Sequence, residues 1–140
     1  MKKIVTLFAL LLCITTSAAY AEQSVQNEKI IDLTPVNGVV PFSTYFKSGT
    51  LNINRNSASV SISLTTSANQ TVSHIYHDVT VYKNGTWISS ERYENWNKKS
   101  LSTSFNVSAT SGDYIDVYVD HYTSHNGTTE VGHNHKSLTF

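Results

Sequence analysis

The chain has 140 residues, with ten Lys and Arg against ten Asp and Glu, and a single cysteine. This length fits one domain, and the lack of a long basic run makes a nucleic acid a poor candidate partner. One cysteine excludes an internal disulfide framework.

Residues 1–21 have the three-part layout of a secretory signal peptide. Lys2 and Lys3 precede an apolar run over residues 4–14 that only Thr6 interrupts, and small residues at Ala19 and Ala21 fit a cleavage site. The apolar run is too short for the roughly 20 residues that a membrane-spanning helix needs, so we expect no permanent membrane anchor. The sequence therefore predicts a secreted, extracellular protein.

Cys13 raises the alternative of a lipoprotein signal, in which a cysteine becomes the lipid-bearing first residue. It follows Leu12 rather than a small residue, so ordinary cleavage after Ala21 is favoured. Cleavage would remove the only cysteine together with Lys2 and Lys3. Eight Lys and Arg would then stand against ten Asp and Glu, leaving a slightly acidic chain that folds by burial alone.

Residues 22–40 are predicted to be an amino-terminal leader or linker before a single domain over residues 41–140. The leader mixes Gln, Asn, Glu and Lys with a short apolar patch at Ile30, Ile31 and Leu33. Two alternatives follow: the leader is disordered, or the patch forms a short strand on the edge of the domain.

After Pro41 the sequence alternates apolar and polar residues, as strands with one buried face do. The pattern covers residues 50–55, 58–66 and 100–107, and Val60, Ile62 and Leu64 exemplify the apolar side. These segments are Ser/Thr-rich on the opposite side.

Two hairpins are predicted at Asn84-Gly85 and Asn126-Gly127, because Asn-Gly supplies the positive backbone angles of a tight turn. The first joins strands over residues 72–83 and 86–93. The second joins residues 114–125 to residues 128–136.

About seven strands result, separated by turn-rich breaks at residues 67–70, 95–99 and 108–112, and no helical pattern of useful length is present. This spacing is typical of sandwiches. We therefore expect an all-β fold, an antiparallel two-sheet β-sandwich that is immunoglobulin-like in general architecture. A small barrel is the alternative.

The export signal, the Ser/Thr-rich strands, the Val81-Tyr82-Lys83-Asn84-Gly85-Thr86-Trp87 hairpin and the Gly112-Asp113-Tyr114 segment carry a resemblance. With these features the chain resembles small secreted proteins of Gram-positive, Bacillus-type bacteria that are catalogued only as a domain of unknown function. The resemblance covers most of the mature chain. It implies fold and export but no activity.

The first hairpin predicts an aromatic face that could bind a ligand. Its turn would pair Tyr82 with Trp87 and Tyr76 with Tyr93, opposite a face of aliphatic residues. Such rings stack on sugars or anchor a protein partner. The alternative is an ordinary outer sheet face, because Tyr and Trp favour strands.

The second hairpin predicts a possible metal site. If His125 pairs with Thr128, Asp120 lies opposite His133 and Tyr118 opposite His135, with Asp116 on the same face. Imidazole and carboxylate groups bind zinc or copper. The favoured alternative is a solvated face of ordinary cross-strand Asp and His pairs, with no cofactor. His77 lies on an aliphatic face and is expected to be a semi-buried, hydrogen-bonded histidine.

The leading functional hypothesis is a non-enzymatic binding module for cell-wall glycan, matrix or a protein partner. The alternatives are an extracellular metal-binding protein, a secreted toxin or antimicrobial factor, and a hydrolase. No cysteine nucleophile, Gly-x-Ser-x-Gly elbow or His-Glu-x-x-His motif is present. Asp116 and Asp120 could form a carboxylate pair, but such pairs on one face of a strand are common and do not by themselves indicate glycoside hydrolysis.

Overall fold

The computed structural model describes residues 29–33 and 43–140 and is built from β-strands. The predicted signal peptide over residues 1–21, with Cys13, and the rest of the predicted leader lie outside the described residues. No helix in the described ranges is long and apolar enough to span a membrane. The strands are β1 (Lys29–Asp32), β2 (Phe46–Arg55), β3 (Ser59–Lys83), β4 (Thr86–Ser108), β5 (Tyr114–His125) and β6 (Thr128–Thr139).

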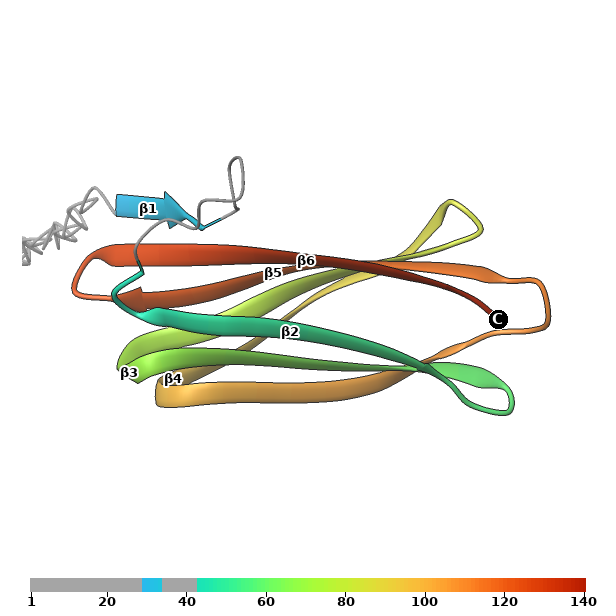
Figure 1. Cartoon of the computed structure of the whole chain (residues 1–140), viewed down its shortest axis with the longest axis horizontal. Helices are drawn as coiled ribbons and strands as arrows, with labels where there is room; N and C mark the ends of the chain where they lie inside the picture. Colours follow the sequence, from blue (N-terminus) through green and yellow to red (C-terminus); the bar gives the residue numbers. More distant parts are fainter. Residues whose placement is uncertain (1–28, 34–42) are drawn as a thin grey trace, which may run out of the picture.

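The six strands form one sheet, in which the order β1-β6-β5-β3-β2 is joined by β4 pairing with β3. All pairings are antiparallel except that of β1 with β6, so the sheet is mixed. The all-β prediction is thus confirmed. The expected two separate sheets are not found. Instead, β3 and β4 are long, continuous strands, and each belongs to both halves of one curled sheet (Figure 1).

The long strand β3 folds back on itself near its middle. Thr66 and His77 are eleven residues apart, which would separate them by about 36 Å in a straight strand, yet Thr66 Oγ1 lies 3.1 Å from His77 Nδ1. The pairing of β3 with β4 shifts register between Ser67 and Val72, and Asn97 of β4 has a φ of 54°. The predicted breaks at residues 67–70 and 95–99 are therefore irregularities within continuous strands, which join four of the seven predicted strands into two, and β1 brings the number of strands to six.

The fold-back creates an inner face on which the two halves of the sheet pack. Apolar residues of the first half meet those of the second half in one cluster, and all its members are at most 4% exposed. The cluster comprises Leu51, Val60, Ile62, Leu64, Val79, Val81, Ala109, Ile115, Val117 and Val119. The strict alternation read from the sequence is the cause, because it puts one apolar side chain on this face at every second position.

Glu130 joins β6 to the start of β2, and its side chain is fully buried. Its carboxylate accepts hydrogen bonds from the backbone N–H groups of Thr44, Tyr45 and Phe46 at 2.6–2.8 Å and from the Ser43 hydroxyl at 2.8 Å. Burial alone raises the pKa of Glu130, but these four donors outweigh burial and lower it. An ionised carboxylate thus closes the curled sheet at this end.

Two glycines allow β2 to approach β5 and β6 closely. A Cβ atom at Gly49 would lie 2.3 Å from Cδ2 of His121, and one at Gly132 would lie 2.6 Å from Cζ of Phe46. Both distances are shorter than van der Waals contact, so neither position accepts a side chain unless its neighbour moves. Both neighbours are rings, but His121 is fully buried whereas Phe46 is only half-buried.

We expect Gly49→Ala to lower the free energy of unfolding by about 1–3 kcal/mol, because His121 has no space into which to move. Urea denaturation measures this loss. The matched variant Gly132→Ala should lose less, since the ring of Phe46 lies nearer to solvent. Equal stability of Gly49→Ala and the unsubstituted protein would contradict this close approach.

Both predicted hairpins are confirmed. Asn84-Gly85 and Asn126-Gly127 have positive φ angles at both positions, as a type I′ turn requires. The first turn is held by Asp113, whose carboxylate accepts from the Asn84 amide at 2.8 Å and lies 2.6 Å from Lys83 Nζ. The Lys83 ammonium, followed by further hydrogen-bond donors, holds the pKa of Asp113 well below its usual range.

The apolar patch of the predicted leader forms a strand, which is the second of the two alternatives read from the sequence. β1 pairs in parallel with β6, with Ile30 opposite Thr129 and Asp32 opposite Val131. Leu33 follows the strand and is buried at 5% exposure. The edge of the sheet therefore includes residues that the sequence placed before the domain.

Candidate functional site

The two outer faces of the folded sheet differ in chemistry. The face over β2 and the first half of β3 carries small uncharged groups, such as the pairs Ser63–Ser104 and Thr65–Ser102, whose hydroxyls bond across strands at 3.2 and 3.1 Å. The face over the second half of β3, called the aromatic face below, carries rings and charges. Its members on β3, β4, β5 and β6 are His74, Tyr76, Asp78, Thr80, Tyr82, Trp87, Arg92, Glu94, Trp96, Asp116, Tyr118, Asp120, Tyr122, His133 and His135.

The register of the first hairpin confirms one predicted aromatic pair and corrects the other. Tyr82 lies opposite Trp87 as expected. The register then shifts by one residue, because Val81 pairs with Ser89 and leaves Ile88 without a partner residue. The predicted pairing of Tyr76 with Tyr93 is therefore wrong, and Tyr76 lies opposite Glu94.

Tyr93 belongs to the inner face instead of the aromatic face. Its ring packs against Phe105 with 6.2 Å between centroids and lies 5.7 Å from the ring of His77. Burial, followed by the hydrogen bond to Glu91, raises the pKa of Tyr93 to about 12. A single extra residue in the strand has this effect because side chains alternate between faces.

The register of the second hairpin is confirmed. His125 pairs with Thr128, Asp120 with His133 and Tyr118 with His135. The aliphatic residues between them, Ile115, Val117 and Val119, are at most 1% exposed, so the Asp and Tyr residues must occupy the outer side.

The four predicted metal ligands are brought to one face but form two separate pairs. His135 Nε2 lies 2.5 Å from Asp116 Oδ1, and His133 Nδ1 lies 2.6 Å from Asp120 Oδ1. His133 also faces Asp32 of β1 at 3.3 Å. Among the described residues, no group of three or more His, Cys, Asp or Glu is placed to hold a metal ion. The zinc or copper site stays a prediction.

One part of the aromatic face is a ladder of rings in contact with one another. Trp96 stacks on His74 with 3.8 Å between centroids, His74 on Tyr76 at 4.6 Å, and Tyr76 on Tyr122 at 4.4 Å. The Arg92 guanidinium lies 4.5 Å from the centroid of Tyr76 and forms two 2.7 Å bonds with Asp78. The two rings inside this ladder, His74 and Tyr76, are already in contact with other side chains of the protein, which favours a structural role for them.

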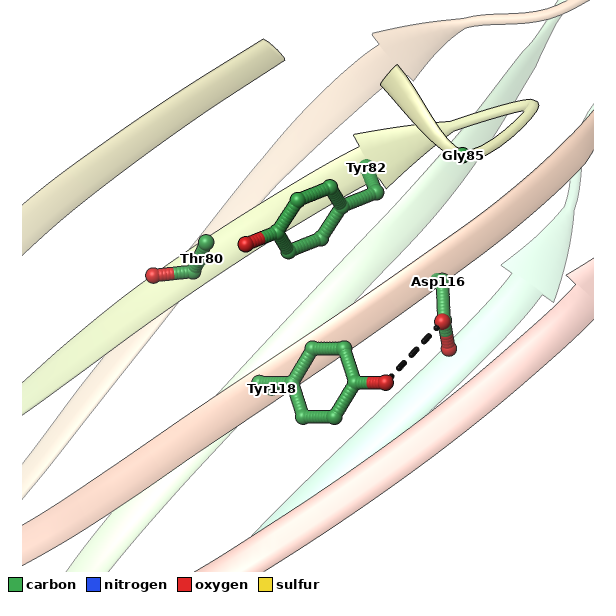
Figure 2. A pocket seen from close by; sticks show the side chains of 5 residues that line it. All are labelled: Thr80, Tyr82, Gly85, Asp116 and Tyr118. Atoms are coloured by element: carbon green, nitrogen blue, oxygen red, sulfur yellow. Dashed lines mark hydrogen bonds between the residues drawn. The ribbon is translucent and has the colours of Figure 1, made fainter. Parts of the chain in front are cut away.

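The other part of the aromatic face contains a groove of about 410 Å³ lined by Thr80, Tyr82, Gly85, Asp116 and Tyr118. Figure 2 shows Tyr82 and Tyr118 on neighbouring strands, with Asp116 beside the Tyr118 hydroxyl. The two tyrosine rings meet edge to face, 5.9 Å apart at 86°. Tyr118 therefore leaves at least one face of the half-buried Tyr82 ring uncovered.

Asp116 and Tyr118 are held in place by their neighbours. The Tyr118 hydroxyl donates to Asp116 Oδ2 at 3.2 Å, and the imidazole of His135 stacks on Tyr118 with 4.3 Å between centroids. Burial, followed by the hydrogen bond to Asp116, raises the pKa of Tyr118, so its hydroxyl stays protonated at neutral pH. The groove therefore presents aromatic surface next to an ordered carboxylate acceptor.

The sequence reading placed Tyr82 and Asp116 in two different candidate sites and did not assign Tyr118 to either. The structure unites all three, because β3 pairs with β5 and puts Tyr82 opposite Asp116 and Thr80 opposite Tyr118. These strands are separated along the chain by the whole of β4. The alternation of Tyr and Asp over residues 114–122 indicates that Asp116 and Tyr118 share a face. The sequence does not indicate that β3, which carries Tyr82, is the neighbouring strand.

A second polar cluster lies on the inner face and is closed to solvent. His77 and His121 are both fully buried, and their Nδ1 atoms lie 3.1 and 2.8 Å from the Thr66 hydroxyl. His77 Nε2 lies 3.2 Å from the Thr103 hydroxyl. The prediction of a hydrogen-bonded histidine at position 77 is confirmed, and its burial is complete.

Burial lowers the pKa of both histidines to about 4, against a weaker opposing effect of Asp78 on His77. The neighbouring His77 lowers the pKa of His121 further. Both rings are therefore neutral at neutral pH, and this cluster stabilises the core rather than contacting a ligand.

No family model matches the chain, and the search of curated proteins gave no match. Among solved structures, the chain is similar to a crystal structure of a protein from Archaeoglobus fulgidus, with 12% identity and a TM-score of 0.34. The match covers 68% of this chain and 97% of the archaeal one.

Proposed function

We propose that this chain is a secreted, non-enzymatic binding module that holds an extracellular glycan on its aromatic face. The observation that carries the proposal is the groove in which Tyr82 and Tyr118 flank Asp116. Aromatic rings pack on the apolar face of a sugar ring, while a carboxylate accepts hydrogen bonds from its hydroxyls. Immunoglobulin-like architecture and export remain predictions within this proposal.

The rest of the aromatic face supports a rigid binding surface. Apart from Gly85 in the turn between β3 and β4, the lining of the groove lies on two adjacent strands of the sheet. The ring of Tyr118 is fixed by contacts with His135 and Asp116. Trp87 lies opposite Tyr82 on β4 and is 58% exposed. A preorganised aromatic surface loses little conformational entropy when a ligand binds.

Tyr82→Ala and Tyr118→Ala should each weaken binding to purified peptidoglycan or chitin about tenfold, near 1.4 kcal/mol, because each removes one ring of the groove. Co-sedimentation of the mature protein with the two polymers measures this effect. Trp96→Ala is the matched control, since Trp96 is 60% exposed on the same face but lies outside the groove.

The control variant should bind as the unsubstituted protein does. Unchanged binding by both groove variants, with their folding verified by circular dichroism, would contradict a glycan site at this position. If none of the proteins sediments with either polymer, the proposal of a glycan as the ligand is itself contradicted.

A further inference from the structure

The lining of the groove carries a negative charge and no permanent positive charge. Asp116 is the only charged residue in its lining, which contains no Lys or Arg. Two permanent cations of the first hairpin are already paired: Lys83 Nζ lies 2.6 Å from Asp113, and Arg92 is bound to Asp78. Among the described residues, Asp116 is paired with the imidazole of His135, which is not permanently charged.

The same face shows what a complete arrangement of ring, carboxylate and cation looks like in this protein. In the ladder, the Arg92 guanidinium lies over the ring of Tyr76 and binds both oxygens of Asp78. At the groove, Tyr118 and Asp116 reproduce the ring and the carboxylate, with Tyr82 as a second ring. The imidazole of His135, which stacks on Tyr118 and bonds to Asp116, takes the place of the guanidinium, and the lining holds no Lys or Arg. A cation supplied by a ligand would add the permanent positive charge that this arrangement lacks.

We infer that the groove selects a sugar that carries a free, protonated amino group, as in a de-N-acetylated amino sugar. The sugar ring packs on Tyr82, and the ammonium group binds the carboxylate of Asp116 where this carboxylate lines the groove. This inference rests on the proposed glycan function and names its substrate class. A charge-assisted hydrogen bond to a carboxylate is stronger than a neutral one, which gives the amine its preference.

Isothermal titration calorimetry with two matched hexasaccharides tests the inference. The chitosan hexamer, with free amines, should bind the mature protein at least tenfold more tightly than the fully N-acetylated chitin hexamer. Equal affinities would overturn the amine preference and leave the glycan function standing, whereas no binding of either hexamer would contradict both.

Asp116→Asn is the decisive variant, because it keeps the shape of the side chain and removes its charge. It should abolish the preference for the chitosan hexamer, so that the variant binds the two hexamers with equal affinity. Asp120→Asn is the matched control, since Asp120 is also a His-paired carboxylate on this face but lies outside the groove, and this variant should keep the preference. A preference that survives Asp116→Asn would overturn the assignment to this groove.

Spermidine distinguishes an amine on a sugar from an amine alone. It carries the charge without a ring to pack on Tyr82, so it should bind at least tenfold more weakly than the chitosan hexamer. Equal or tighter binding of spermidine would overturn the sugar assignment. Circular dichroism of Asp116→Asn establishes that its fold is intact, and the wild-type comparison of the two hexamers stands even if that variant does not fold.

Discussion

Replacing Glu130 with alanine is expected to lower the free energy of unfolding by about 2–4 kcal/mol. The substitution removes the acceptor of three consecutive backbone N–H groups and of the Ser43 hydroxyl at the start of β2. Buried donors that lose their only partner cost about 1–3 kcal/mol each, and water replaces part of this loss where the strand end is half exposed. Urea denaturation at pH 7 measures the change.

Glu130→Gln separates charge from shape. The amide keeps one oxygen acceptor but turns a donor toward N–H groups, so it should recover less than half of the stability lost in Glu130→Ala. Glu91→Gln is the matched control on an exposed carboxylate, with an expected change within about 0.5 kcal/mol. A Glu130→Ala protein as stable as this control would show that the contacts of Glu130 do not close the sheet.

The sequence predicted the local structure of this protein well. Alternation located the buried aliphatic residues of β5, and Asn-Gly fixed both hairpin turns, because these features depend on residues close together in the chain. The register of the second hairpin followed directly from its two-residue turn and brought Asp120 opposite His133. The residues that the second hairpin contributes to the aromatic face were predictable in this way.

What the sequence could not predict depends on pairings between distant segments. The unpaired Ile88 and the shift between Ser67 and Val72 are irregularities that no turn residue marks unambiguously, and the first of them moved Tyr93 to the inner face. The groove requires β5 to lie beside β3, which is a choice of topology rather than of local propensity. Hence Tyr118 was visible as a strand residue but not as the partner of Tyr82.

Lowering the pH from 7 to 4.5 is expected to destabilise the protein through the two buried histidines. The pKa of each is about 4 in the folded protein, below the ordinary value of 6.5 that applies after unfolding. The unfolded chain therefore binds more protons in this window, so stability is fully present above pH 6.5 and is lost as the pH falls toward 4. Once the pH is below 4, a pKa shift of this size lowers the free energy of unfolding by about 3 kcal/mol for each ring.

The charges near this histidine pair compensate only weakly: Asp78 raises the pKa of His77 and Asp120 that of His121, but burial outweighs both effects. Thr66 and Thr103 offer hydroxyls, Tyr93 stays protonated, and each imidazole that gains a proton repels the other across 5.8 Å between ring centroids. The carboxylate of Glu130 titrates separately. Because its pKa is lowered in the folded protein, its contribution to stability is lost only below about pH 4.5. The interval between pH 6.5 and 4.5 thus isolates the histidines.

Urea denaturation at pH 7.0, 6.0, 5.0 and 4.5 measures the slope of stability against pH, which should approach about 1.4 kcal/mol per pH unit for each histidine that titrates. His121→Asn should lower this slope by about half, because it removes one of the two buried groups. Stability at pH 5.0 equal to that at pH 7.0 would contradict a buried neutral pair, since two buried imidazoles with only weak compensating charge cannot accept protons without weakening the fold.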